Sequence, residues 1–155
     1  MKGKSSVDER VQKSGVIKFD PDYCIGCQAC FLVCPLCHKG VISCDLSRVI
    51  WISGSFESLT KGKPAFCDQC DYPECYYSCP VGAIYIDKAT GARCIDPETC
   101  TGCKECIEAC PFDPPRINFD SEREIAIKCD LCGGDPKCVK ICPNNALSYI
   151  PKGER

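Results

Sequence analysis

The sequence is poor in the residues from which most enzyme active sites are built. Its 155 residues include one histidine, His38, together with one methionine and one tryptophan. A single histidine leaves no serine–histidine–aspartate set, and no phosphate-cradling or dinucleotide-binding glycine pattern occurs. We therefore expect no catalytic residue and no organic cofactor on this chain.

Strong charge and long apolar runs are also lacking. The net charge is −2 and the isoelectric point is about 5.5, so no basic field suggests binding to nucleic acid or to an anionic membrane. No apolar run approaches transmembrane length, and the N-terminus has neither a signal-peptide core nor twin arginines. These absences predict no direct membrane insertion and a cytoplasmic location.

Cysteine, by contrast, occurs 19 times, and sixteen of these residues form four quartets. Every quartet begins C-x2-C and closes C-x3-C-P, and only the middle gap varies, from two residues to five. The longer gaps contain turn formers such as Pro73, Gly133 and Pro136. The quartets are Cys24, Cys27, Cys30 and Cys34; Cys67, Cys70, Cys75 and Cys79; Cys100, Cys103, Cys106 and Cys110; and Cys129, Cys132, Cys138 and Cys142.

The first and third quartets have the C-x2-C-x2-C-x3-C-P spacing of a [4Fe–4S] ferredoxin site. Two-residue gaps let a short loop bring three thiolates to one cluster. The fourth cysteine follows on a helical turn that points away, and in ferredoxins it binds a different cluster. The proline after it is expected to end that turn. The sequence thus predicts sixteen iron ligands and four [4Fe–4S] clusters.

Disulfides and zinc are the competing interpretations of so many cysteines. A disulfide framework does not repeat one metal-type spacing four times, and a zinc site needs two separated cysteine pairs rather than a run of three. Three cysteines fall outside the quartets. Cys44 and Cys94 lie in strand-like stretches and are expected to be small buried hydrophobes, whereas Cys37 is an alternative ligand to Cys34.

Between the quartets the pattern is strand, cysteine loop, short helical turn, strand, which indicates an α+β fold. We expect a flexible N-terminal arm over 1–15, a cluster-binding domain over 16–150 and a tail over 151–155. The polar stretch 53–63 is a candidate docking loop. Strands are expected at 16–19, 41–44, 48–52, 82–87, 92–96, 116–119, 124–127 and 146–150.

Acidic residues near the cysteines admit two interpretations: they lower the reduction potentials of the clusters, or they form an ordinary solvated surface. They are Asp68, Asp71, Glu105, Glu108 and Asp130.

With its four quartets, the chain resembles the four-cluster iron–sulfur subunits of modular oxidoreductases, such as those of DMSO reductase, nitrate reductase and formate dehydrogenase. The resemblance extends from Cys24 to about Ile150 and is most specific at Cys67–Pro80 and Cys129–Pro143. It implies two ferredoxin-like modules, an outer one built from motifs 24–34 and 129–142 and an inner one from motifs 67–79 and 100–110.

The same resemblance implies four crossed ligand sets, although the spacings alone equally allow pairing of the first motif with the second and the third with the fourth. The implied sets are Cys24, Cys27 and Cys30 with Cys142; Cys129, Cys132 and Cys138 with Cys34; Cys67, Cys70 and Cys75 with Cys110; and Cys100, Cys103 and Cys106 with Cys79.

The chain is shorter than most members of that family, and compact versions accompany hydrogenases, carbon monoxide dehydrogenases and tungsten enzymes of the aldehyde oxidoreductase type. We therefore expect an electron-transfer subunit whose catalytic partner carries a tungsten or molybdenum pterin. A further flavin- or quinone-linked subunit is a second candidate partner. A hydrogenase or formate dehydrogenase partner, or a free soluble polyferredoxin, is the alternative. Because sixteen of the apolar-class residues are predicted ligands, metal binding is expected to supply most of the folding free energy.

Overall fold

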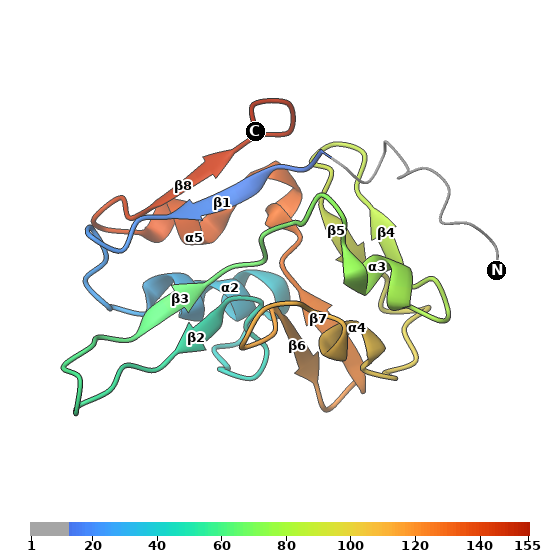
Figure 1. Ribbon diagram of the computed structural model, residues 1–155, viewed down its shortest axis with the longest axis horizontal. Coiled ribbons are helices and arrows are strands. Elements are labelled where there is room, and N and C mark those ends of the chain that lie inside the picture. The colour runs from blue at the N-terminus through green and yellow to red at the C-terminus, as the bar shows by residue number, and fades with distance from the viewer. Residues whose placement is uncertain (1–12) are drawn as a thin grey trace.

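The computed structural model describes residues 13–155, which form short helices and short antiparallel strands (Figure 1). This confirms the α+β class. The strands are β1 (Val16–Phe19), β2 (Ile50–Ile52), β3 (Lys63–Ala65), β4 (Ile84–Ile86), β5 (Arg93–Ile95), β6 (Ile117–Asp120), β7 (Ile125–Lys128) and β8 (Leu147–Ile150). The helices are α2 (Ala29–Lys39), α3 (Glu74–Ser78), α4 (Glu105–Glu108), the 3-10 helix η1 (Leu131–Gly134) and α5 (Lys137–Ile141).

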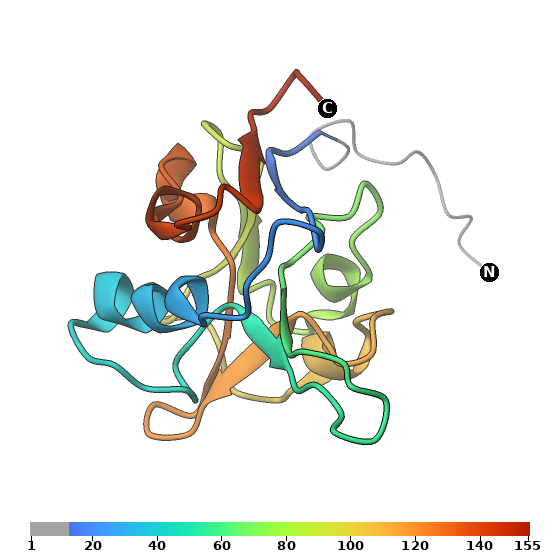
Figure 2. The ribbon, with the colours of Figure 1, turned by 90° about the vertical axis from the view of Figure 1, so that its left-hand side faces the viewer.

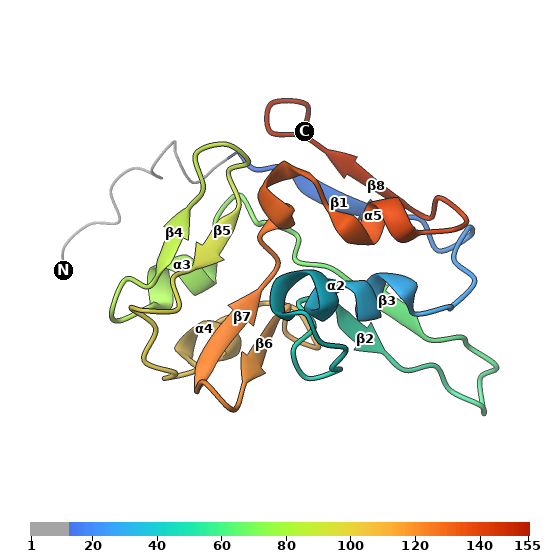
Figure 3. The same ribbon diagram turned by 180° about the vertical axis from the view of Figure 1, so that it is seen from behind.

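The strands pair as four separate two-stranded sheets within the described part of the chain. Three pairs are sequence neighbours, β2 with β3, β4 with β5 and β6 with β7, whereas β1 pairs with the distant β8, Val16 opposite Ile150 and Phe19 opposite Leu147. Helix α2 packs on α5, and α3 packs on α4. The first and fourth cysteine motifs therefore share one half of the molecule and the second and third share the other (Figures 1 and 3).

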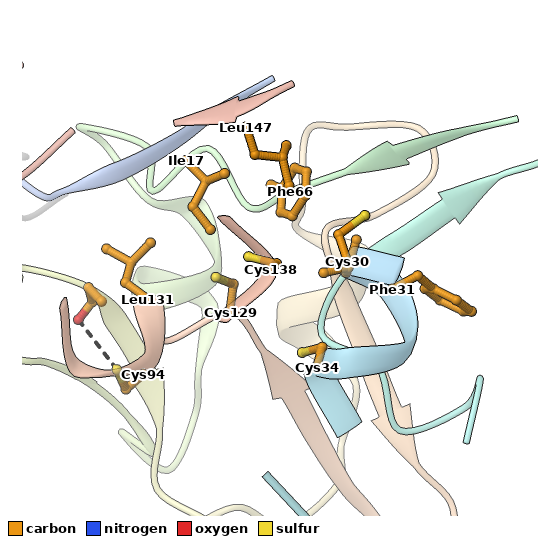
Figure 4. Close-up of a cluster of buried hydrophobic side chains, with 12 residues drawn as sticks. Ile17, Cys30, Phe31, Cys34, Phe66, Cys94, Cys129, Leu131, Cys138 and Leu147 are labelled. Atoms are coloured by element: carbon orange, nitrogen blue, oxygen red, sulfur yellow. Dashed lines mark hydrogen bonds between the residues drawn. The ribbon is translucent and has the colours of Figure 1, made fainter. Parts of the chain in front are cut away.

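The core contains cysteines among its ordinary hydrophobic residues. Figure 4 shows Cys129 and Cys138 at its centre, with Ile17, Leu131 and Phe66 around them and Cys30 and Cys34 on the neighbouring α2. A second, smaller buried group surrounds Cys106 with Ile84, Ile117 and Ala126. Few large apolar side chains fill these cores, so their packing depends on the sulfur-bearing loops.

Helix α2 differs from the expected short turn, because it continues past Pro35 to Lys39. Proline inside a helix removes the N–H that would donate to the carbonyl four residues earlier, here that of Phe31. The Ser47 hydroxyl donates to this carbonyl at 2.9 Å, and Ser47 is fully buried. A side chain from the following loop thus replaces the missing helical hydrogen bond.

Two strand expectations need correction. Residues 41–44 are not a strand; Val41, Ile42 and Cys44 are exposed in an irregular segment. The expected strand at 48–52 forms only as β2, and its partner is β3, whose first residue, Lys63, lies at the end of the expected loop. The hairpin joining β2 and β3 projects from the body of the molecule (Figures 1 and 2). The other expected strands are confirmed, with ends shifted by up to two residues.

Residues 1–12 of the expected N-terminal arm lie outside the described residues. Ser14 and Gly15 are buried, and the Gly15 N–H donates to the Thr90 carbonyl at 2.7 Å, in the turn between β4 and β5. Of the helices in 13–155, none is long and apolar enough to cross a membrane.

Candidate metal centres

The last cysteine of every quartet has the same local environment. Its sulfur accepts a backbone N–H from a residue further along the chain: Cys79 from Ala83 at 3.2 Å, Cys142 from Ala146 at 3.3 Å. Cys110 accepts from Arg116 and Cys34 from the more distant Arg48, each at 3.3 Å. A hydrogen bond to sulfur favours the charged thiolate, which is the form that binds metal. At all four positions the backbone thus favours the thiolate, the form that the predicted ligand role requires.

Thiols of the first and fourth motifs lie together. Burial raises the pKa of Cys30 to about 12, and neighbouring thiols, among them Cys27 and Cys142, add to the shift. Burial likewise raises the pKa of Cys138 to about 12, with contributions from Cys132, Cys34 and Cys30. The packing of α2 on α5 creates both groups, because it brings Cys34 of α2 to the fourth motif's thiols and Cys142, which follows α5, to those of the first.

Thiols of the second and third motifs meet in the same crossed way. Burial raises the pKa of Cys75 to about 11, and Cys67, Cys110 and Cys70 lie among the thiols that raise it further. Burial raises the pKa of Cys106 to about 12, with contributions from Cys75, Cys100, Cys103 and Cys79. Such closely spaced, buried thiols repel one another when ionised, so an arrangement of this kind suits a cation that binds them all.

The two halves meet at Cys129 and Cys67. Burial raises the pKa of Cys129 well above its ordinary value, and the Cys67 thiol adds to that shift. Gln69, between the first two cysteines of the second motif, is 1% exposed and forms hydrogen bonds to both halves. Its amide donates to the Cys129 carbonyl at 2.9 Å and accepts the Arg93 N–H at 2.9 Å.

One cavity shows how well the residues fit an iron–sulfur cluster. It is lined by the four thiols of Cys67, Cys70, Cys75 and Cys110, from the second and third motifs. Arg93, Arg116 and Lys128 line it as well. Buried Nε and Nη2 of Arg93 and Nε of Arg116 have no hydrogen-bond partner among the described residues. Orphaned donors beside four thiols fit an anionic group with several sulfur acceptors.

The comparisons with known proteins agree with this chemistry. Residues 60–151 match the 4Fe-4S dicluster domain, and residues 17–36 match the 4Fe-4S binding domain. The chain belongs to the 4Fe-4S dicluster family. Multiple [4Fe–4S] clusters are therefore the cofactors of this family member, as the quartets predicted.

Relatives of this dicluster protein include subunits of larger enzymes. It is 41% identical over 137 residues to the polyferredoxin-like subunit of the aliphatic sulfonate oxidoreductase of Pyrococcus furiosus, covering 88% of this chain and 76% of that subunit. It is 34% identical to the iron–sulfur subunit of the nitrate-inducible formate dehydrogenase of Escherichia coli K12, covering 94% of this chain and 57% of the subunit. The hydrogenase-2 operon protein HybA of Escherichia coli O157:H7 is 28% identical, with 88% and 51% covered.

Beside the fourth motif of this dicluster protein lies a polar network that the sequence did not reveal. The Nε2 of His38 is 3.1 Å from Asp130 Oδ1, its Nδ1 is 2.8 Å from the Cys34 carbonyl oxygen, and Arg48 Nη1 is 2.5 Å from Asp130 Oδ2. Hydrogen bonds to Asp130, Cys132 and Cys34 raise the pKa of His38. Burial would raise the pKa of Asp130, but His38 and Arg48 hold it well below its usual value.

This network shows that Asp130 is held by protein partners, whereas the sequence left open whether it belongs to an ordinary solvated surface. His38, Asp130 and the Cys132 thiol lie within 4.8 Å of one another. Cys132 is a predicted iron ligand, and Asp130 already pairs with Arg48, so His38 and Asp130 are polar neighbours of that thiol. The sequence did not predict this contact because His38 and Asp130 are 92 residues apart in the chain.

The remaining acidic residues of the prediction have exposed side chains. Asp68, Glu105 and Glu108 are exposed, and Asp71, 67% exposed, lies 3.5 Å from Arg155 of the tail. The solvated-surface interpretation therefore describes these four better than it describes Asp130.

The three cysteines outside the quartets are placed differently from one another. Cys94 is buried on β5, as expected, with its sulfur 3.7 Å from the Ala92 carbonyl oxygen (Figure 4). Cys44 is exposed, so the expectation of a buried residue there is wrong. Cys37 is exposed on α2, whereas Cys34 is buried one turn earlier.

Proposed function

We propose that this protein is the electron-transfer subunit of an oxidoreductase complex and carries four [4Fe–4S] clusters in the crossed ligand sets. The observation that supports it best is the crossed grouping of the thiols. In this proposal, cluster I is held by Cys24, Cys27, Cys30 and Cys142, and cluster II by Cys129, Cys132, Cys138 and Cys34. Cluster III is held by Cys67, Cys70, Cys75 and Cys110, and cluster IV by Cys100, Cys103, Cys106 and Cys79.

The thiol contacts also support a linear order from I to IV. The Cys138 thiol of cluster II lies near the Cys30 thiol of cluster I. Cys129 and Cys67 connect II with III, and Cys75 and Cys106 connect III with IV. Bound [4Fe–4S] clusters supply one-electron transfer. The chain's contribution is to hold their ligands in one unbranched series.

Thiol exposure supports clusters I and IV as the two ends. Among the sixteen predicted ligands, only Cys27 and Cys103 are exposed, and they belong to clusters I and IV. The ligand cysteines of clusters II and III are buried or half-buried. Electrons would therefore enter at one exposed end and leave at the other.

The end at cluster I has the features of a lasting protein contact. The β2–β3 hairpin carries Phe56, 94% exposed, and Leu59, 85% exposed. Leu59 and Lys61 of this hairpin share a groove with Cys24, and the Lys61 amine donates to the Cys24 carbonyl oxygen. Exposed apolar surface of this kind marks protein–protein contacts. We assign it to the catalytic subunit.

The proposed partner is a tungsten or molybdenum pterin enzyme of the aldehyde oxidoreductase type. Support comes from relatives that are named as subunits of a sulfonate oxidoreductase and a formate dehydrogenase. A flavin- or quinone-linked subunit would then exchange electrons at the other end. A cytoplasmic location belongs to the same proposal.

Anaerobic purification from the native cell tests the proposal, with iron, zinc, molybdenum and tungsten quantified and accompanying chains identified. We expect about 16 iron atoms per chain and a large subunit that carries tungsten or molybdenum. The same iron content without a partner would identify a free polyferredoxin. Zinc in place of iron would disprove the cluster assignment.

A further inference from the structure

The cavity of cluster III is the only one of the four proposed sites, within residues 13–155, that is lined by buried cations without an ion pair. Arg93 is 1% exposed and Lys128 is 3% exposed, and both line the cavity beside Cys67, Cys70 and Cys75. Arg116, half-buried, completes the group and lies over the Phe112 ring at 5.1 Å. None of the three is within ion-pair distance of a described carboxylate.

The side-chain hydrogen bonds of these three cations go to neutral backbone carbonyl groups, which leave most of the positive charge uncompensated. The Lys128 amine donates to the Arg93 carbonyl, and Arg93 Nη1 donates to the Gly91 carbonyl at 3.0 Å. Arg116 Nη1 donates to the Pro114 carbonyl at 2.5 Å. The orphaned donors are Nε and Nη2 of Arg93 and Nε of Arg116. Buried cations are costly unless an anion compensates them, so these three require negative charge in the cavity.

The nearby carboxylates are too exposed to compensate that charge. Asp68, Asp71 and Glu74 lie on the same stretch of chain, and Glu74 also lines the cavity. All three are exposed, and Asp71 pairs with Arg155. Exposed charges are screened by water and salt, whereas buried ones are screened much less. The field within the cavity is therefore dominated by the three cations.

No other proposed site has such a group of three cations. At cluster II, Arg48 and His38 are both paired with Asp130, and Lys128 also lies near the ligand Cys129. At cluster I, Lys61 is exposed. At cluster IV, the cysteine loop packs on the turn between β6 and β7, where the exposed residues are mostly acidic. The exposed acidic residues of the loop and the turn together are Glu98, Glu105, Glu108, Glu122 and Glu124, and the cations among them are Lys104 and Arg123.

We propose that Arg93, Lys128 and Arg116 make cluster III the most oxidising of the four, so that an electron in the chain of clusters resides there. Reduction adds one negative charge to a cluster, and fixed positive charge in a dry cavity favours the reduced form. The proposal rests on the proposed function, because it assumes the four ligand sets. It assigns these three residues a role in setting a potential, not in binding iron.

The test is an anaerobic redox titration of the holo chain followed by electron paramagnetic resonance. The signal of cluster III is first identified as the one altered in a Cys75→Ser variant. Replacing Lys128 by Met keeps the buried aliphatic stem and removes the charge. We expect at least a tenfold loss in the equilibrium constant for reducing cluster III, a fall of about 59 mV. The potentials of clusters I and IV should change much less, and that of cluster II, whose ligand Cys129 lies near Lys128, should fall by less than that of cluster III.

Matched variants separate charge from packing. Arg116→Gln should lower the potential of cluster III in the same direction, whereas Arg116→Lys, which keeps the charge, should restore most of it. Lys88→Met removes an equally positive but exposed side chain in the β4–β5 turn and should leave cluster III unchanged. If Lys128→Met fails to retain iron, the Arg116 pair still decides the matter.

A second measurement needs no variant. Raising the ionic strength should leave the potential of cluster III nearly constant and shift that of cluster IV upward, because the carboxylates around Cys103 are exposed and are screened by salt. Unchanged potentials in Lys128→Met and Arg116→Gln, with four clusters retained, would overturn this inference alone. A chain without [4Fe–4S] clusters would overturn the proposed function itself.

Discussion

At the scale of single residues, the structure distinguishes two cysteines that the sequence offers as alternatives. Cys34 is buried, faces the fourth motif's thiols and accepts the Arg48 N–H. Cys37, three residues further along α2, is exposed. These placements favour Cys34 as the ligand.

This choice predicts different outcomes for two alanine variants. Cys34→Ala should lose about a quarter of the iron, because one of four clusters loses a ligand, and Cys37→Ala should keep all of it. Iron content and the resonance spectrum of the reduced protein provide the measurement. Loss of iron from Cys37→Ala but not from Cys34→Ala would show that Cys37 is the ligand.

Ser47 is expected to stabilise α2, because its hydroxyl donates to the Phe31 carbonyl oxygen. Replacing Ser47 by Ala leaves the Phe31 carbonyl unsatisfied in a buried site, at a cost of about 1–3 kcal/mol. We expect the clusters of Ser47→Ala to be lost at a lower guanidinium concentration than those of the unchanged chain. Their visible absorbance during unfolding is the measurement. Ser53→Ala, which changes an exposed serine near the end of β2, is the control and should behave like the unchanged chain. Equal guanidinium midpoints for the two variants would show that the Ser47 hydrogen bond does not stabilise the protein.

At the scale of secondary-structure elements, the β2–β3 hairpin is the feature that the cluster motifs do not require. Its strands pair over three residues each, and its tip contributes exposed apolar side chains beside the first motif. The hairpin is therefore available for contact with another chain.

This role can be tested by placing a charge on the hairpin tip. Phe56→Asp with Leu59→Asp should weaken association with the catalytic subunit by about 30-fold or more, as expected for apolar side chains at the centre of an interface. Co-purification and titration of the two separated subunits measure this. Tyr85→Asp, a matched change at a half-exposed aromatic residue on β4, should leave association intact. An unchanged affinity in the hairpin variant would assign the contact to another surface.

At the scale of the whole molecule, the fold depends on what its thiols bind. Without metal, the native arrangement buries thiols such as Cys30, Cys106 and Cys138, and burial raises the pKa of each to about 12 from an ordinary 9.0. A raised pKa favours folding only while the thiol stays protonated. That contribution is complete below about pH 9 and is lost progressively between pH 9 and pH 12.

We therefore expect the chain to unfold when iron is removed by a chelator, and any residual structure to decline as the pH rises above about 9. Circular dichroism with and without iron, between pH 7 and pH 10, is the measurement. The iron-loaded chain serves as the control. Cooperative unfolding of the iron-free chain, with a midpoint independent of pH, would contradict this dependence.

Local sequence alone determined the cofactor and most of the secondary structure. The Cys–Pro ends, the two-residue gaps and the turn formers act over a few residues, so the spacing of a quartet indicates iron–sulfur chemistry before any folding is known. Strands such as β1, β4 and β8 followed from short apolar runs for the same reason. The expected strand at 41–44 failed because its apolar residues pack against nothing and remain exposed.

Only the tertiary structure decided which motifs meet and what surrounds them. The spacings allowed tandem and crossed pairing alike; the contact of β1 with β8 and of α2 with α5 groups the first motif with the fourth. The pairing of His38 with Asp130 and the burial of Arg93 and Lys128 beside Cys67 join residues far apart in the chain. The burial and the charged partners of these residues depend on how distant segments of the chain pack together, so no local pattern in the sequence predicts them.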